Sequence, residues 1–357
     1  MALALALGRQ GLGETWPNPS VGCVIVKDMR IIGRGRTAVG GRPHAEAAAL
    51  EQAGAAAKGA TAYVTLEPCA HQGRDESCSD KLIRAGVARV VAAVQDPFPH
   101  VDGQGFDKLR QAGITCDTNV LQTEAEASHQ GFFTRVRLGR PMVTLKLALS
   151  LDGRIATATG ESKWITGPEA RARVHLMRAS HDAVMIGAGT ARADDPELSV
   201  RNLGISRKPV RIIVSSDGNI PLDGKIVKTA PETPIWLCHG TNLPEGRILE
   251  LKVFEVKLIE CAAKGSRVDV ADMLQNLGKR GLTRVFCEGG GQLAASLLAA
   301  NQVDHLVIFH AGLALGADGR AGLGKLPGER LSDFPRFRLQ RHERVGSDML
   351  SYWDAAI

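Results

Sequence analysis

The chain has 357 residues, which is too long for one small core and enough for two domains that fold without disulfide bonds. Hydrophobic residues make up 44% and charged residues 23% of it, which is ordinary for a globular protein. The net charge of +6 is spread along the chain, so it favours anionic ligands such as phosphates and gives no argument for a nucleic-acid partner.

The cysteines and the apolar runs indicate the compartment. Seven cysteines without regular spacing do not form the pattern of a secreted disulfide framework, so a reducing compartment fits better. The opening MALALALGRQGLG lacks a basic leader and a cleavage site, and it predicts a helix of the fold. No apolar stretch approaches the ~20 residues that span a bilayer. We therefore expect a cytoplasmic protein with no membrane partner.

The first part of the chain alternates strand-like and helical segments. Residues 21–26 and 31–35 predict a hairpin, residues 61–66 and 88–94 predict further strands, and residues 44–53 and 78–86 predict helices that glycines end. Such alternation predicts an α/β domain in which helices cover a sheet.

A second α/β module follows the basic, Gly- and Pro-containing RVRLGRP, which marks a boundary and divides the chain into domains 1–138 and 139–357. Helices are predicted over 167–180 and 268–281. Strands are predicted over 142–149, 182–187, 209–214, 234–238, 284–288 and 305–309. Their order in the sheet cannot be derived from the pattern.

Four residues of the first module combine into a metal site. His44 begins a predicted helix two residues before Glu46, Cys69 follows a predicted strand, and Cys78 begins the next helix. One imidazole and two thiolates suit Zn²⁺ with an open fourth position, the arrangement of a catalytic site, and zinc lowers the pKa of bound water to about 7. Glu46 is placed to move protons. The pattern is that of zinc nucleobase deaminases, although buried thiols and a simple helix start are the alternatives.

The cysteine spacing departs from the usual Pro-Cys-x-x-Cys, because Gln72 stands three residues after Cys69. The third ligand is therefore either Cys78 across a longer loop or His71.

The segments TWPNPSVGCVIV, GRPHAEAAAL, ATAYVTLEPCAHQGRDESC and LIRAGVARVVAAVQDPFPHVDGQG closely resemble the deaminase half of the bifunctional deaminase/reductase of bacterial riboflavin biosynthesis. The likeness continues through the second module, from KLALSLDGRIATATGESKWITGPEARARVHLMRASHDAVMIGAGTARADDPELSVR to EGGGQLAASLL. Members of that family usually carry Thr-Pro-Pro where this chain has Asp75, Glu76 and Ser77.

The resemblance implies a cytidine-deaminase-like three-layer domain followed by a dihydrofolate-reductase-like domain, with Zn²⁺ and NADPH as cofactors. The first domain would hydrolyse the 2-amino group of 2,5-diamino-6-(5-phosphoribosylamino)pyrimidin-4-one. The second would reduce the ribosyl group of the product to ribityl. We further expect a phosphorylated pyrimidine as the small-molecule substrate and a homo-oligomer.

The resemblance also assigns site residues. His44, Cys69 and Cys78 would hold the metal, Glu46 would be catalytic, and Asn18 and His71 would contact the substrate, although Asn18 could be only a turn residue and His71 could merely order the loop. In the reductase, Ser162, Arg178, Arg201 and Glu288 would contact the substrate. The NADPH site would comprise Ala148, Trp164, Thr190, Asp194, Gly290, Gly291, Gln292, Leu293, Ala294, Ala295 and Ser296. Lys146 and Asp152 either shape this site or are a surface charge and a turn residue.

Three rival functions remain open on the residues. A polynucleotide deaminase would show the short cysteine spacing and no reductase module, and the 4% aromatic content offers few platforms for base stacking. A structural zinc protein would normally close the fourth metal position. The Asp-Glu-Ser segment also leaves room for an active reductase with an impaired deaminase.

Overall fold

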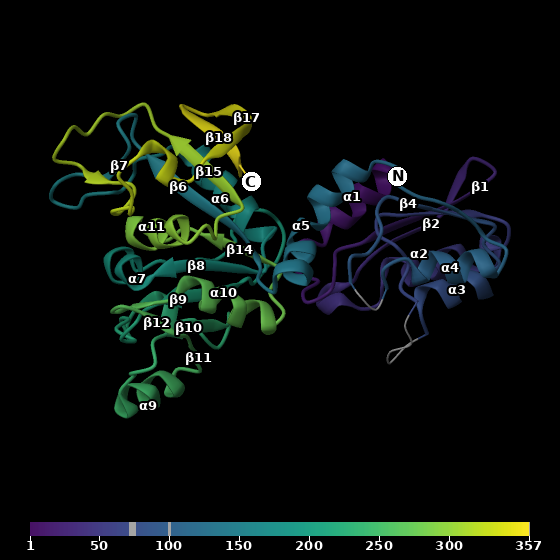
Figure 1. Cartoon of the computed structure of the whole chain (residues 1–357), viewed down its shortest axis with the longest axis horizontal. Coiled ribbons are helices and arrows are strands. Elements are labelled where there is room, and N and C mark those ends of the chain that lie inside the picture. Colours follow the sequence, from purple (N-terminus) through teal and green to yellow (C-terminus); the bar gives the residue numbers. More distant parts are fainter. Residues whose placement is uncertain (71–75, 99–100, 357) are drawn as a thin grey trace. The chain divides into compact units, whose positions relative to one another are not determined.

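The computed structural model describes residues 1–70, 76–98 and 101–356 (Figure 1). The chain divides into two compact units, Met1–Gly139 and Arg140–Ile357. Each unit is described by itself below.

The first unit is a sheet of order β2-β1-β3-β4-β5 between two layers of helices. β1 pairs antiparallel with β2 and β3, whereas β3, β4 and β5 run parallel. Figure 1 shows α1 and α5 over one face and α2, α3 and α4 over the other, so the predicted three layers are confirmed. The elements are α1 (Ala2–Gln10), β1 (Gly22–Lys27), β2 (Arg30–Arg36), α2 (Ala45–Ala53), β3 (Thr61–Val64), α3 (Cys78–Arg84), β4 (Arg89–Ala92), α4 (Gln104–Gln111), β5 (Thr115–Asp117) and α5 (Gln122–Leu138).

Two glycines of β2 let helix α2 lie directly on the sheet. A Cβ at Gly33 would lie 2.2 Å from the carbonyl oxygen of Ala49, and one at Gly35 would lie 2.1 Å from that of Ala45. Any side chain there would push the helix away. The alanines on this side of α2 are buried in the core, so the small residues of both elements fix where α2 begins. That beginning carries His44.

The second unit is built on a nine-stranded sheet of order β11-β10-β9-β8-β14-β6-β15-β18-β17. The strands from β11 to β15 run parallel, and β18 and β17 add an antiparallel edge. The nine strands of this sheet are β6 (Met142–Leu149), β8 (Ala183–Gly187), β9 (Val210–Val214), β10 (Ile235–His239), β11 (Lys257–Glu260), β14 (Arg284–Cys287), β15 (His305–His310), β17 (Phe337–Val345) and β18 (Asp348–Ala355). Two small pairs lie outside it: β7 (Arg154–Ala156) with β16 (Arg320–Ala321), and β12 (Ala263–Lys264) with β13 (Arg267–Val268). The helices are α6 (Pro168–Ala179), α7 (Ala188–Asp194), α8 (Lys225–Lys228), α9 (Glu245–Val253), α10 (Val270–Lys279) and α11 (Gly291–Ala299).

The strands and helices predicted from apolar patterning are present, with ends shifted by no more than three residues. The elements that the pattern missed include α4, α5, α7, α9, β5, β11 and the C-terminal hairpin of β17 and β18. Strand β17 exposes most of its side chains, so it lacks the alternation that marks a half-buried strand.

The seven cysteines all lie in the described part of the chain and none is in a disulfide. Among the described residues, no helix has both the length and the apolar character needed to cross a bilayer.

Candidate active sites

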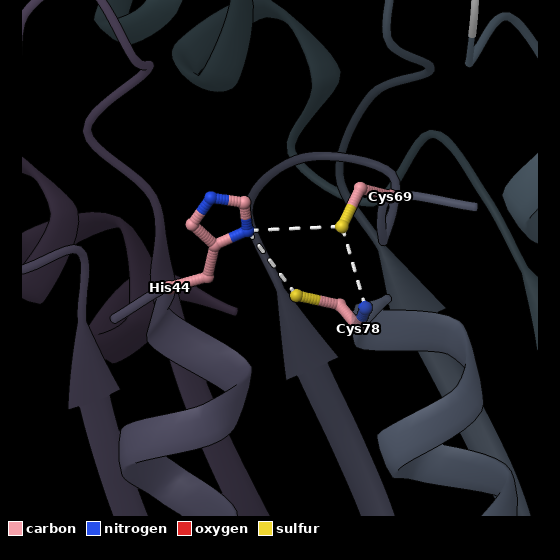
Figure 2. Close-up of side chains that lie close together, drawn as sticks. All are labelled: His44, Cys69 and Cys78. Atoms are coloured by element: carbon pink, nitrogen blue, oxygen red, sulfur yellow. Dashed lines mark hydrogen bonds between the residues drawn. The ribbon is translucent and has the colours of Figure 1, made fainter. Parts of the chain in front are cut away.

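Three potential metal ligands converge at the ends of a strand and two helices in the first unit (Figure 2). His44 occupies the position directly before α2, Cys69 lies in the loop after β3, and Cys78 is the first residue of α3. His44 Nδ1 lies 3.3 Å from Cys78 Sγ and 3.7 Å from Cys69 Sγ, and the backbone N–H of Cys78 donates to Cys69 Sγ at 3.3 Å. Of the two candidates for the third ligand, Cys78 is thus beside His44 and Cys69, while His71 lies outside the described residues.

The donor set fits tetrahedral zinc. Ligands at ~2.0–2.3 Å from one tetrahedral centre lie roughly 3.3–3.8 Å apart, which matches the separations of His44 Nδ1 from the two sulfurs. The pKa of the Cys69 thiol is lowered to about 4, because hydrogen bonds from Cys78 and His44 outweigh its burial. A thiolate is therefore available as a ligand.

Glu46 stands beside this cluster in a cavity of about 80 Å³ that His44 and Cys69 also line. Its side chain is 3% exposed, and burial raises the pKa of its carboxyl. A carboxyl of raised pKa next to a three-ligand metal site is suited to take up and release a proton during a reaction.

Two further acids of this cavity escaped the sequence prediction. Glu67 accepts hydrogen bonds from the backbone N–H groups of Asp96, Gly103 and Gly105, at 3.2, 3.0 and 2.9 Å. It thereby fixes the segment that brings Asp96 and Phe98 to the cavity wall. Burial raises the pKa of Asp96 to about 7. Glu67 and Pro68 directly precede the predicted ligand Cys69, and this closeness was a signal for Glu67 in the sequence. No local pattern, however, relates Glu67 to the residues whose N–H groups it accepts from.

The remaining predicted residues near the metal ligands have local roles. The side-chain amide of Asn18 donates to the carbonyl of Gly41 at 3.2 Å, and its neighbour Pro19 lines the cavity. Ser77 Oγ accepts from the backbone N–H of Asp80 at 3.2 Å, so it caps α3 directly before Cys78. The unusual serine of this loop therefore stabilises the helix that presents the second cysteine.

The second unit carries a cavity system at the carboxyl ends of its parallel strands. Cys287 of β14 pairs with Met185 of β8, and Gly187 of β8 pairs with Val214 of β9, so the three strands end at one edge. Two cavities of about 560 and 530 Å³ lie there. Such crevices are where open α/β sheets bind ligands. Both are lined by Lys146, Ala148, Ser162, Thr190, Asp194 and Glu288.

Arg178 and Glu288 form a fork-to-fork ion pair at the floor of the second of these cavities. Arg178 Nε and Nη2 lie 2.5 and 3.0 Å from the carboxylate oxygens, and the side chains are 12% and 10% exposed. The pKa of Glu288 is lowered, because the charge and hydrogen bonds of Arg178 outweigh the effect of burial. Burial lowers the pKa of nearby Lys146. The sequence prediction treated Arg178 and Glu288 as separate substrate contacts, whereas the structure joins them.

The glycine-rich turn after β14 lines the first cavity through Gly290, Gly291, Gln292 and Leu293. Thr190 Oγ1 accepts from the backbone N–H of Gly290 at 2.9 Å, which ties α7 to the turn.

The other predicted residues of this unit lie around these two cavities. Trp164, 69% exposed, and Arg201 line the second cavity, Ser296 lines a third, and Ala294 and Ala295 are buried at 0% and 4% exposure. Asp152 accepts hydrogen bonds from the backbone N–H groups of Leu315 and Gly316. These contacts fit the interpretation of Asp152 as a turn residue.

Comparison with known proteins now identifies both units. Residues 1–94 match the family described as cytidine and deoxycytidylate deaminase zinc-binding region, and residues 141–351 match the RibD C-terminal domain. The riboflavin biosynthesis protein RibD of Escherichia coli is 43% identical over 98% of this chain and 96% of its own length. The chain belongs to the RibD family.

Solved RibD structures agree with this assignment. Acinetobacter baumannii RibD, form 2, superposes with a TM-score of 0.89 at 38% identity, covering 99% of this chain and 97% of that one. The Thermotoga maritima diaminohydroxyphosphoribosylaminopyrimidine deaminase/5-amino-6-(5-phosphoribosylamino)uracil reductase superposes with a TM-score of 0.86 at 33% identity, covering 100% and 97%.

The RibD assignment confirms the main predictions from sequence. The fold class is confirmed, and the chain is a bifunctional enzyme of riboflavin biosynthesis that carries out a deamination and a reduction. Its cofactors are Zn²⁺ and NADPH.

Proposed function

We propose that residues 1–138 hydrolyse the 2-amino group of 2,5-diamino-6-(5-phosphoribosylamino)pyrimidin-4-one, releasing ammonia and 5-amino-6-(5-phosphoribosylamino)uracil. Residues 139–357 then reduce the ribosyl group of that product to ribityl with NADPH. The observation that carries the proposal is the arrangement of Glu46 beside three zinc-ligand atoms that lie within 4.8 Å of one another. The Thermotoga protein, whose name states both reactions, supports the choice of substrate.

In the deaminase, His44, Cys69 and Cys78 hold the metal. Bound Zn²⁺ would supply Lewis-acid activation of water. Glu46 would accept a proton from the attacking water and pass it to the departing amine, for which its raised pKa is suited. The family resemblance implies that Asn18 contacts the pyrimidine; it implies the same for His71, which lies outside the described residues.

In the reductase, the two cavities that share Lys146, Ala148 and Glu288 would hold the cofactor and the sugar, and bound NADPH would supply the hydride. The substrate contacts are Ser162, Arg178, Arg201 and Glu288. The cofactor contacts are Ala148, Trp164, Thr190, Asp194 and the segment 290–296. Arg201 pairs with Glu197 at 2.9 Å on the exposed rim, so its guanidinium retains donors for a substrate phosphate.

We also propose a homo-oligomer in the cytoplasm. Free cysteines throughout the described chain support a reducing compartment. Strand β17 ends the large sheet and leaves one side of its backbone for another strand, which supports assembly. Light scattering coupled to gel filtration measures the oligomeric state.

The test compares wild type with Glu46→Gln in the zinc-loaded full chain. We expect wild type to release ammonia from the diaminopyrimidinone phosphate and to oxidise NADPH. Because the amide cannot shuttle a proton, Glu46→Gln should lose ammonia release by at least about a hundredfold. It should keep NADPH oxidation when given the deaminated product.

Other outcomes identify the rivals. One equivalent of zinc without ammonia release, together with normal reduction of the deaminated product, would mean an impaired deaminase. Absence of both activities in zinc-loaded wild type would contradict the proposal, and polynucleotide or structural-zinc functions would be tested next.

A further inference from the structure

A short segment after α7, residues 196–201, lies beside the second cavity of the reductase unit and belongs to no helix or strand. It carries Arg201, a proposed substrate contact, which lines that cavity. Leu198 in its middle has a φ of 54°, in the left-handed region that a residue with a Cβ seldom adopts, and its side chain is buried. The backbone of this segment therefore depends on contacts from other elements for its shape.

Side chains of β9 and α6 bind the backbone of the segment. Arg211 of β9 donates from Nη1 to the carbonyl of Glu197 at 3.3 Å. Arg178 of α6 donates from Nη1 to the carbonyl of Ser199 at 2.9 Å. Both guanidinium groups thus hold carbonyl groups that precede Arg201 in the chain.

His175 binds the same backbone next to Arg201 itself. It lies one turn before Arg178 on α6, and its Nδ1 is 3.1 Å from the carbonyl oxygen of Ser199 and 3.3 Å from the backbone nitrogen of Arg201. The nitrogen makes one of these bonds at a time: as N–H it donates to Ser199, and with a lone pair it accepts from Arg201. Because both bonds fasten the same stretch of backbone, either tautomer holds it.

The imidazole of His175 acts here as a neutral group. Burial lowers its pKa, and the charge of Arg178 lowers it further, so His175 adds no positive charge to the cavity near pH 7. A neutral imidazole attracts a phosphate far less than a guanidinium does. The position of His175 therefore suits a hydrogen bond to the backbone better than a charge contact with the substrate.

We propose that His175 is a positioning residue of the reductase, which fixes the backbone at Ser199 and Arg201 and thereby places the Arg201 guanidinium for the substrate phosphate. The inference rests on the proposed reductase. The side chain of Arg201 is long and exposed, and its printed partner Glu197 belongs to the same segment. If the backbone lost its anchor, this side chain would have to be ordered when the substrate binds, which weakens binding.

Steady-state reduction of the deaminated product by the zinc-loaded full chain tests the proposal. His175→Leu removes the ring nitrogen and keeps an apolar side chain of similar size. It should raise the KM for the deaminated product about tenfold and leave kcat and the KM for NADPH within about twofold of wild type, because an interaction that serves substrate binding is lost.

His175→Asn is the matched variant. The asparagine amide offers an acceptor and a donor close to the place of Nδ1, so it can make either bond to the backbone. Its KM for the deaminated product should stay within about twofold of the wild-type value.

A double-mutant cycle with Arg201→Ala separates positioning from other roles. Once the guanidinium is gone, its placement no longer matters. His175→Leu should therefore change the KM for the deaminated product by less than about twofold in the Arg201→Ala background.

The proposal is overturned if His175→Leu keeps the wild-type KM, or if His175→Asn is as impaired as His175→Leu. It is also overturned if the loss persists undiminished in the Arg201→Ala background, because His175 would then contact the substrate or support the fold in general. A wild-type enzyme that reduces no deaminated product would overturn the proposed reductase together with this inference, whereas the other outcomes, in an active wild type, overturn the inference alone.

Discussion

Buried ionisable side chains of the reductase unit owe their charge state to partners distant in sequence. Glu288 is ionised because Arg178, 110 residues earlier, forms two hydrogen bonds with it. His181 is kept neutral: its Nδ1–H donates to the carbonyl of Met177 at 2.7 Å, and Nε2 accepts from Thr144 Oγ1 at 3.0 Å. Residue types alone indicated neither pairing.

The buried imidazole of His181 leads to a prediction about how the stability of the reductase unit depends on pH. Burial lowers the pKa of its imidazole from 6.5 to about 3, below that of the unfolded chain. The contribution of neutral His181 to the free energy of unfolding is therefore fully present above the unfolded pKa and is lost as pH falls toward the folded pKa. This loss makes the unit about 2 kcal/mol less stable near pH 5 than near pH 8. His181→Asn should remove that part of the pH dependence.

Urea unfolding followed by tryptophan fluorescence measures the effect, since Trp164, Trp236 and Trp353 lie in this unit. His342→Asn, on the exposed face of β17, is the control and should keep the wild-type slope. Equal pH dependence of His181→Asn and wild type would contradict the assignment.

At the scale of elements, tight packing and loop hydrogen bonds place the deaminase residues. Gly33 and Gly35 let α2 approach β2, which sets where His44 and Glu46 stand. Glu67 holds the segment after β4 through three backbone N–H groups. Apolar periodicity predicts the elements themselves, but these two contacts join parts of the chain that no periodic pattern relates.

Glu67→Gln should loosen that segment. A glutamine would turn an NH₂ group toward backbone donors, so at least one buried N–H loses its acceptor at a cost of about 1–3 kcal/mol. We expect faster hydrogen exchange at the amides of Gly103 and Gly105 and a lower kcat for ammonia release. Glu51→Gln, on the exposed side of α2, should change neither. Unchanged exchange in Glu67→Gln would show that the loop is held by other contacts.

On the scale of the whole molecule, each unit has its own buried core and its own ligand. Zinc and NADPH should therefore stabilise different thermal transitions of the full chain. At a hundredfold excess over Kd a ligand adds about 2.7 kcal/mol, which raises the midpoint of a unit of this size by roughly 5–11 °C.

Scanning calorimetry with and without a chelator or NADPH tests the independence of the two ligands. Metal removal should lower one transition and abolish ammonia release, while reduction of the deaminated product continues. NADPH should raise the other transition. If the chelator lowered both transitions and both activities together, the two sites would not be independent.

The sequence alone predicted the α/β class, most strands of both sheets, and His44 and Cys69 as metal ligands with either Cys78 or His71 as the third, because apolar periodicity and ligand types are local properties. It also carried the family resemblance, which extends over nearly the whole chain. The strand order, the pairing of Arg178 with Glu288 and the support of the deaminase cavity by Glu67 became visible only in the folded chain. The strand order and these side-chain contacts depend on which strand ends lie at the same edge of a sheet and on which charged groups are buried together. Neither can be derived from the separation of residues along the chain.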